Sequence, residues 1–242
     1  MRTERDGLAI GGVPATELAH AYGTPLLALD TDVLDANVAW FASAGERLGI
    51  DVYYAGKALL FVQLARRIAA GGLGIDVCSL GELLTAERAG VPPARLVMHG
   101  CGKTETELDA IAAGRVGRVV VDHFEELAGL ANRASNDSPI SVLLRLNTGV
   151  AARTHAHVLT GGEASKFGFS RETIDRAIAF AVASDGIVLG GVHGHLGSQL
   201  FDAEPYAQSA GVLVDTLARM RAAGAPAHDL VVGGGFGVAG RP

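Results

Sequence analysis

Short apolar runs alternate with amphipathic stretches along most of the chain. Five runs begin about 21 to 24 residues apart and two follow at wider spacing, at 51–56, 74–79, 95–100, 117–122, 140–147, 187–197 and 229–235. They are rich in Val, Ile and Leu and end in polar or glycine-containing turns, as buried strands do. The stretches between them repeat apolar residues at helical spacing and predict helices at 31–48, 59–70, 81–89, 105–113, 124–133, 171–184 and 205–223.

This alternation predicts a parallel α/β fold. Seven strands in unbroken βα order favour a (β/α)8 TIM barrel over an open doubly wound sheet. The chain ends shortly after the seventh strand, so we expect residues 31–242 to form a barrel truncated at that point. An open parallel edge favours aggregation, so we expect a partner to cover it. Residues 1–30 should be a separate lead-in that includes a strand-like run at 24–30.

Composition excludes several classes of function. Of the 242 residues, 49% are hydrophobic and 19% are charged, and the net charge of −6 with dispersed lysines and arginines provides no basic surface for nucleic acid. No apolar run reaches the roughly 18 residues of a membrane span, and the N-terminus lacks the apolar segment of a signal peptide. We therefore expect a soluble, cytoplasmic protein. Cys78 and Cys101 match neither zinc nor redox spacing, and no metal site is expected.

Polar side chains gather where the predicted strands end. In a TIM barrel the carboxyl ends of the strands form the catalytic face. Lys57 follows the first strand directly, and glycines end the seventh. The polar residues at the other strand ends are Asp76, Ser79, Glu82, His99, Asp122, His123, Arg145, Asn147, His193, His195, Ser198 and Gln199.

Three of these features together point to one cofactor. Gly233, Gly234 and Gly235 follow a strand and expose backbone N–H groups, as phosphate-binding loops do, although such glycines can also serve tight packing alone. A desolvated lysine such as Lys57 captures aldehydes, and His195 offers a flat ring for stacking. Pyridoxal 5′-phosphate, held as a Schiff base, fits all three. No G-x-G-x-x-G motif follows the early strands, which argues against a nucleotide-dependent dehydrogenase.

The same segments resemble the fold-type III pyridoxal-phosphate decarboxylases, whose barrel is of the alanine racemase type, and most closely their diaminopimelate decarboxylase branch. "YYAGKALL" looks like that family's Tyr-Ala-x-Lys-Ala segment, and "GIDVCSLGEL" is similar to its next strand and helix start. "GEASKFGFS", at 162–170, resembles the Ser-Lys-Phe-Gly loop, and "HGHLGSQ" and "LVVGGGFG" match its His-x-Gly-Ser-Gln and phosphate-binding glycines. The motifs occur in family order from about residue 23 to the end.

The resemblance implies a role for each matching residue. Lys57 would be the Schiff-base lysine and a proton carrier, and His195 would stack on the pyridine ring. Ser198 would bind the phosphate together with residues 233–235. The residues expected to support the cofactor environment are Asp76, Glu82 and Arg145. The implied reaction is decarboxylation of an amino acid, meso-diaminopimelate, to give L-lysine for lysine biosynthesis.

The sequence also departs from the family. The Glu-Pro-Gly-Arg element and the cysteine-containing C-terminal β-domain do not occur in the 242 residues, so a homodimer or a separate C-terminal partner is expected. Leu80 stands where glycine is commoner, and Cys101 and Gly102 stand where asparagines are typical. Two alternatives stay open: a single-domain pyridoxal-phosphate homeostasis protein, and an inactive fragment of a decarboxylase. "HGHLGSQ" and "ASKFGFS" favour the decarboxylase over the homeostasis protein.

Overall fold

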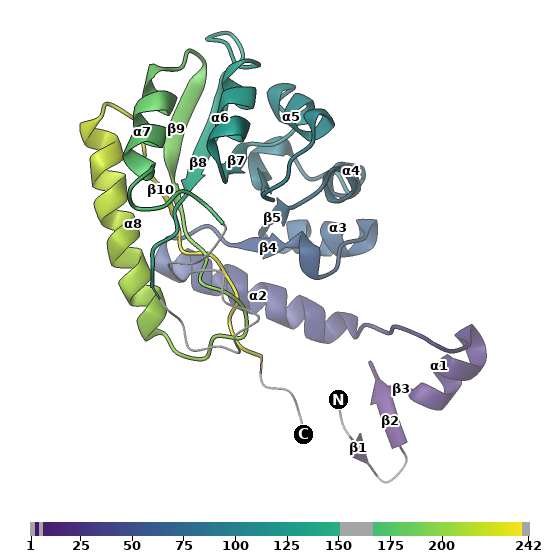
Figure 1. Cartoon of the computed structure of the whole chain (residues 1–242). Coiled ribbons are helices and arrows are strands. Elements are labelled where there is room, and N and C mark those ends of the chain that lie inside the picture. The colour runs from purple at the N-terminus through teal and green to yellow at the C-terminus, as the bar shows by residue number, and fades with distance from the viewer. Residues whose placement is uncertain (1–2, 5–6, 151–166, 239–242) are drawn as a thin grey trace.

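The computed structural model describes residues 3–4, 7–150 and 167–238, and its main body is a curled parallel sheet (Figure 1). Its seven strands are β4 (Tyr53–Ala55), β5 (Gly74–Val77), β6 (Leu96–Met98), β7 (Arg118–Val121), β8 (Ile140–Arg145), β9 (Ile187–His193) and β10 (Asp229–Val231). All neighbouring pairs are parallel, and the spatial order β10-β9-β8-β7-β6-β5-β4 follows the order of the chain. The prediction of a TIM-type barrel fold is confirmed, and the described residues contain seven of its parallel strands.

Seven described helices accompany this sheet; the first precedes its first strand, and the others return the chain along its outside (Figure 1). They are α2 (Thr31–Leu48), α3 (Val62–Ala70), α4 (Leu80–Arg88), α5 (Glu105–Ala112), α6 (Phe124–Ala131), α7 (Ile174–Ala183) and α8 (Glu204–Ala222), with short 3-10 turns at Gly56–Ala58 and Pro93–Arg95. All seven predicted helices are present. The last two strands end earlier than predicted, because residues 194–197 and 232–235 leave the sheet and form loops.

Local signals set both ends of α2. The Asp30 carboxylate accepts hydrogen bonds from the backbone N–H groups of Asp32 at 3.0 Å and Val33 at 3.2 Å, which satisfies free donors of the first turn. Gly49 ends the helix in the left-handed conformation, with φ of 66°. Because these signals are local, the predicted range 31–48 agrees with the structure.

The lead-in differs from the prediction. Residues 24–30 form no strand, and no described strand pairs with them. The regular structure lies earlier, in a small antiparallel sheet of β1 (Thr3–Glu4), β2 (Gly7–Ile10) and β3 (Val13–Pro14), followed by α1 (Ala15–Tyr22). An apolar run becomes a strand only beside a hydrogen-bonding neighbour. Without one, Leu27 stays 76% exposed.

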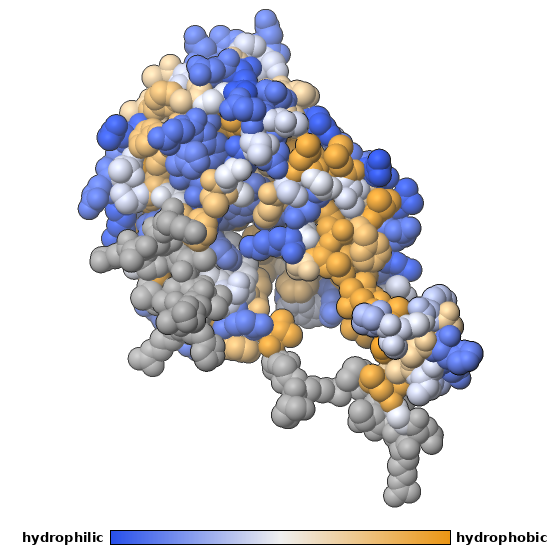
Figure 2. Space-filling view, turned by 45° about the vertical axis from the view of Figure 1, so that its right-hand side comes forward, coloured by the Kyte–Doolittle hydropathy of each residue, from blue (hydrophilic) through white to orange (hydrophobic). Residues whose placement is uncertain are grey.

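Buried apolar residues of the strands and their covering helices form one large cluster that runs through the barrel wall. The surface nevertheless keeps apolar areas (Figure 2). Trp40 is 65% exposed and Leu48 is 64% exposed, whereas Val38 and Gly45 are the buried residues of α2. In the described part of the chain, no helix is both long and apolar enough to cross a membrane.

One arginine on the central strand contacts both edge strands of the sheet. Arg118 begins β7, the central strand, yet its Nε lies 2.5 Å from Asp229 Oδ2 on edge strand β10, and its Nη1 donates to Tyr53 Oη on edge strand β4 at 3.0 Å. In a flat sheet three strand spacings would separate β7 from either edge by about 14 Å. One side chain can contact both edges only because the sheet is curled.

These contacts lie at the amino ends of the strands, opposite the predicted catalytic end. Burial alone would lower the pKa of the Arg118 guanidinium, but the adjacent Asp229 carboxylate keeps that pKa above its ordinary value. Gly74 provides the room for Tyr53, because a Cβ there would lie 2.4 Å from the Tyr53 ring.

We expect Arg118→Met to lower the free energy of unfolding by about 2 kcal/mol, because it leaves the Asp229 carboxylate without its cation; residual solvent contact keeps the loss below that of a fully buried pair. Urea unfolding measures the change. Arg115→Met is the matched control, since it breaks the more exposed Arg115–Glu87 pair and should cost about 0.5 kcal/mol. Equal losses in the two variants would contradict a special role for Arg118.

Candidate active site

Lys57 projects from a tight turn directly after β4. The turn is held from both sides, because the Tyr54 hydroxyl donates to the Leu59 carbonyl oxygen at 2.8 Å across it. Gly56 is buried, and a Cβ there would lie 3.1 Å from both the Asp76 carbonyl oxygen and Glu82 Oε2. A small residue is therefore required before Lys57. The Lys57 side chain is exposed at the carboxyl end of the barrel, so the prediction of a desolvated lysine is wrong for the described residues.

Lys103, the other lysine in the described part of the chain, is unavailable for chemistry. Its side chain is 1% exposed. Its Nζ donates to the Gly100 and Val120 carbonyl oxygens, each at 2.7 Å, and to Glu126 Oε1 at 2.6 Å. An ammonium group has three protons, and all three are used here. Lys57 is therefore the described lysine that can react with a ligand.

Asp76, His99 and His193 form a cluster at the same end of the barrel. Asp76 Oδ2 lies 3.1 Å from His99 Nδ1, and the His99 and His193 rings meet edge to face with centroids 4.5 Å apart. Among the described residues, no hydrogen-bond partner reaches the buried atoms Asp76 Oδ1, His99 Nε2 and His193 Nδ1. Buried polar atoms are normally paired, so three such atoms in one cluster indicate a place for a polar ligand.

His195 follows the end of β9 and faces several charged groups. Burial, together with the nearby charges of Lys57, Arg145 and His99, lowers the pKa of its imidazole to about 4, against an opposing effect of Asp76. The pKa of His193 is lowered well below its ordinary value by complete burial and by the same cations. Both rings are therefore neutral at neutral pH. These mutual influences also show that Lys57, Arg145 and His195 share one site.

The loops after β9 and β10 run side by side. Leu200 N donates to the Gly235 carbonyl oxygen at 3.0 Å, and Gly237 N donates to the Leu200 carbonyl oxygen at 2.8 Å. A Cβ on Gly235 would lie 1.8 Å from the Gly197 carbonyl oxygen, so glycine is needed there for packing. Glycine is needed for packing at position 233 too, because a Cβ there would lie 2.9 Å from His195 Nδ1.

Gly234 differs from its two neighbours. A Cβ there would meet no atom within 4 Å, so this glycine borders open space. Ser198 is exposed on the facing loop, close to Gly235. The glycine run thus combines packing at Gly233 and Gly235 with an open backbone at Gly234, which a phosphate could approach.

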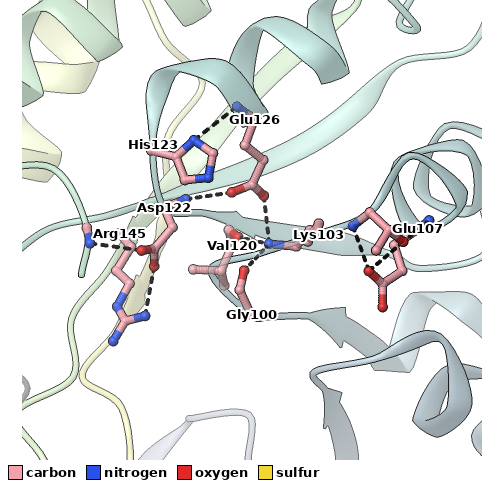
Figure 3. A network of polar contacts seen from close by, with 10 residues as sticks. Gly100, Lys103, Glu107, Val120, Asp122, His123, Glu126 and Arg145 are labelled. Carbon is pink, nitrogen blue, oxygen red and sulfur yellow. Dashed lines mark hydrogen bonds and ion pairs between the residues drawn. The ribbon is translucent and has the colours of Figure 1, made fainter. Parts of the chain in front are cut away.

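Arg145, at the end of β8, pairs with Asp122 at the end of β7, with Nη1 2.7 Å from Oδ1 (Figure 3). Both side chains are at most 10% exposed. His123, also considered a catalytic candidate at this strand end, instead caps α6, where its Nδ1 accepts the Glu126 N–H at 3.3 Å. Glu82 likewise has a structural contact, since its Oε2 accepts the Cys78 N–H at 2.8 Å.

Most of the predicted site residues therefore come together, but some site features were not predicted. Lys57, Asp76 and Arg145 each influence the pKa of His195, and Gly233 lies against His195. Ser165 and Lys166 of the predicted Ser-Lys-Phe-Gly loop lie outside the described residues. His99, His193 and Asp122 were recognised only as polar strand ends, because nothing in the sequence indicates which strand ends face one another.

Comparison with known proteins agrees with this geometry. Residues 35–241 match the family described as pyridoxal-dependent decarboxylase, pyridoxal binding domain. The chain belongs to this family. Pyridoxal phosphate, the predicted cofactor, is accordingly the cofactor of this decarboxylase family.

Individual relatives come from one branch of the family. A diaminopimelate decarboxylase of Actinosynnema pretiosum is 41% identical over 98% of this chain and 53% of the relative, and one of Bacillus subtilis is 39% identical over 96% of this chain and 54% of the relative. The crystal structure of diaminopimelate decarboxylase from M. jannaschii superposes with a TM-score of 0.84 at 30% identity, covering 98% of this chain and 57% of that one. The chain thus spans about half the length of these relatives.

The described residues of this decarboxylase-family chain fit the cofactor. The exposed Lys57 amine suits an aldehyde, the opening at Gly234 suits a phosphate, and the unpartnered atoms of the Asp76–His99–His193 cluster suit the polar edge of a ring. These features lie at the carboxyl ends of the strands, the end at which TIM barrels bind ligands.

The lowered pKa of His195 predicts a pH-dependent stability. Between pH 6.5 and about 4 the unfolded chain takes up a proton on His195 while the folded chain does not, so the free energy of unfolding should fall with pH, by up to about 3 kcal/mol from this group. Urea unfolding of the cofactor-free chain across this range measures the effect.

His195→Gln should show a smaller fall, because it has no imidazole to protonate. His20→Gln, on the exposed surface of α1, is the control and should behave as the unmodified chain does. Parallel stability curves for the unmodified chain and His195→Gln would contradict the lowered pKa.

Proposed function

We propose that this chain is the pyridoxal-binding part of an enzyme that decarboxylates meso-diaminopimelate to L-lysine. The observation that carries the proposal is the convergence of Lys57, Asp76, Arg145 and His195 on one end of the barrel. The names of the relatives support the substrate, and the M. jannaschii enzyme has been crystallised in co-complex with L-lysine.

Lys57 would bind the cofactor covalently. Pyridoxal phosphate supplies an aldehyde that condenses with amines and a ring that accepts the electron pair left when the carboxylate departs. The Lys57 Nζ would hold the aldehyde carbon until a substrate amine replaces it, and would then be free to carry a proton to the substrate α-carbon. The turn fixed by Tyr54 and Leu59 keeps Nζ at the mouth of the barrel throughout.

His195 would stack on the cofactor ring. Its imidazole is neutral at neutral pH because burial and the nearby cations disfavour protonation. A neutral ring can lie against a pyridine that carries positive charge without repelling it, whereas an imidazolium could not. The packing of Gly233 against His195 restrains the orientation of the imidazole.

The phosphate would lie between the two parallel loops. The Ser198 hydroxyl and the backbone N–H groups of Gly233, Gly234 and Gly235 are the donors that we assign to it. Support comes from the open backbone at Gly234 and from the exposure of Ser198 on the facing loop. Backbone donors of this kind bind phosphate without a positively charged side chain.

Asp76 and Arg145 would tune the charge of the site. Asp76 is held by His99 and presents its second oxygen, Oδ1, without a described partner, so that oxygen is available to a cofactor donor. Arg145 brings a positive charge close to His195 and His193. We assign it to the stabilisation of negative charge on the cofactor or substrate.

Completion of the active site by another chain belongs to the same proposal. We propose a homodimer or a separate C-terminal partner that covers the open sheet edge. The cytoplasmic location stays a prediction. The division into a lead-in at 1–30 and a barrel at 31–242 also stays a prediction. Membership in the decarboxylase family disfavours a single-domain homeostasis protein. An inactive fragment stays an alternative that the following experiments distinguish.

We expect pyridoxal phosphate to give a visible absorption band that depends on Lys57. Borohydride reduction followed by peptide mass spectrometry should place the cofactor on residue 57. Lys57→Arg keeps the positive charge but lacks a primary amine, so the band and the labelled peptide should both disappear. Arg67→Ala, on the outer surface of α3, is the control and should leave both unchanged. Labelling at another lysine would overturn the assignment.

Decarboxylation is tested by CO2 and lysine release from meso-diaminopimelate, with ornithine and arginine as competing substrates. The chain is assayed alone and together with the C-terminal β-domain of a diaminopimelate decarboxylase. We expect release that depends on Lys57 and is at least about tenfold faster for meso-diaminopimelate than for the other two amino acids. Cofactor binding without CO2 release under either condition would favour the inactive fragment.

A further inference from the structure

Asp122 holds two separate parts of the site at once. Its Oδ1 accepts from Arg145 Nη1 at 2.7 Å, and its Oδ2 accepts from the Gly168 backbone N–H at 3.1 Å. Arg145 lies at the end of β8, whereas Gly168 belongs to the segment 167–170 before α7. A single buried carboxylate therefore connects the arginine at the mouth of the barrel with a loop segment 23 residues further along the chain.

The backbone of Asp122 is itself held in place by a second buried ion pair (Figure 3). The Asp122 backbone N–H donates to Glu126 Oε2 at 3.0 Å, and Glu126 Oε1 lies 2.6 Å from Lys103 Nζ. Two ion pairs, Lys103–Glu126 and Arg145–Asp122, are thus joined through the Asp122 backbone N–H, and none of the four side chains is more than 10% exposed. Their net charge is zero, which offsets part of the cost of burying them.

Arg145 also contacts the segment 167–170 directly. Its guanidinium carbon lies 4.7 Å from the centroid of the Phe167 ring, and its carbonyl oxygen accepts the Phe169 N–H at 2.8 Å. Gly168 adopts φ of 77°, and a Cβ there would lie 2.7 Å from the Arg145 carbonyl oxygen. The segment 167–170 and Arg145 are therefore packed against each other. The Asp122 carboxylate adds charge-assisted hydrogen bonds to both.

We propose that Asp122 is a positioning residue that fixes the orientation of the Arg145 guanidinium and the position of the segment 167–170 together. The expected effect of Asp122 on catalysis rests on the proposed function. Its expected effect on the segment 167–170 rests on geometry alone. A guanidinium rotates freely about its long stem unless hydrogen bonds hold it. With Asp122 in place, the charge of Arg145 lies at a fixed position beside His193 and His195.

The structural consequence is tested without cofactor or substrate. Asp122→Asn keeps the shape of the side chain but leaves one acceptor oxygen, which cannot serve both Arg145 and Gly168. Hydrogen exchange of the cofactor-free chain, followed by mass spectrometry of the peptide that contains 167–170, should become at least about tenfold faster. Unchanged exchange in this peptide would overturn the proposal whether or not the chain is a decarboxylase.

Glu107→Gln is the matched control. Glu107 is another buried acid at the same end of the barrel, and its carboxylate accepts the N–H groups of Leu80 and Thr104, each at 2.8 Å, without contact to Arg145 or Gly168. The same acid-to-amide change there should lower general stability while exchange at 167–170 stays as in the unmodified chain. Equal acceleration in both variants would show a general loosening and would contradict a specific role for Asp122.

The catalytic consequence is tested by coupling. If Asp122 acts through Arg145, Asp122→Asn should reduce kcat/KM about 10- to 100-fold in the unmodified background and much less in an Arg145→Met background. The fall should lie mainly in kcat, with cofactor labelling at Lys57 retained. Independent, multiplicative effects of the two substitutions would overturn the proposal.

The two proposals fail in different ways. If no cofactor is trapped at Lys57, the proposed function fails and the exchange experiment alone decides the role of Asp122. If cofactor binds but no CO2 is released, the coupling between the Asp122 and Arg145 substitutions is measured from their effects on the dissociation constant of the cofactor. Normal decarboxylation by Asp122→Asn would leave the proposed function standing and overturn the inference.

Discussion

The curvature of the parallel sheet is the constraint on which the site depends, and Arg118 holds that curvature at the amino ends of the strands. The guanidinium connects the central strand β7 to both edge strands, through Asp229 on β10 and Tyr53 on β4. In a flat sheet of the same order, six strand spacings would separate β4 from β10 by about 29 Å. Lys57, which follows β4, and Gly233, which follows β10, could then not serve one ligand.

The carboxyl end of the barrel combines exposed and buried positive charge near neutral rings. Lys57 is exposed on a short turn, whereas Arg145 is buried and held by Asp122. Near these two cations, His193 and His195 stay neutral because burial and both cations disfavour further positive charge. An anionic, flat ligand with polar edges suits this arrangement, which agrees with membership in a pyridoxal-dependent family.

Sequence patterns predicted the regular elements well where the signals are local. The range of α2 followed from its helical periodicity and agrees with the structure, where Asp30 and Gly49 end the helix locally, and the strands followed from their apolar runs. The strand expected at 24–30 was wrong, because pairing depends on a neighbour that the pattern does not contain. The small sheet at 3–14 was missed for the opposite reason: its strands are too short to show a pattern, and they exist through pairing with one another.

The sequence by itself determined the order of strands and helices, the residue types at each strand end and the choice of Lys57 as the reactive lysine, because these depend on neighbouring residues and on motifs. Tertiary structure alone decided which strand ends meet. It showed that Lys103 and His123 are committed to buried and capping contacts, and that Asp122 joins Arg145 to Gly168. Such contacts connect residues distant in the chain, and only the curvature of the sheet brings them within hydrogen-bonding distance.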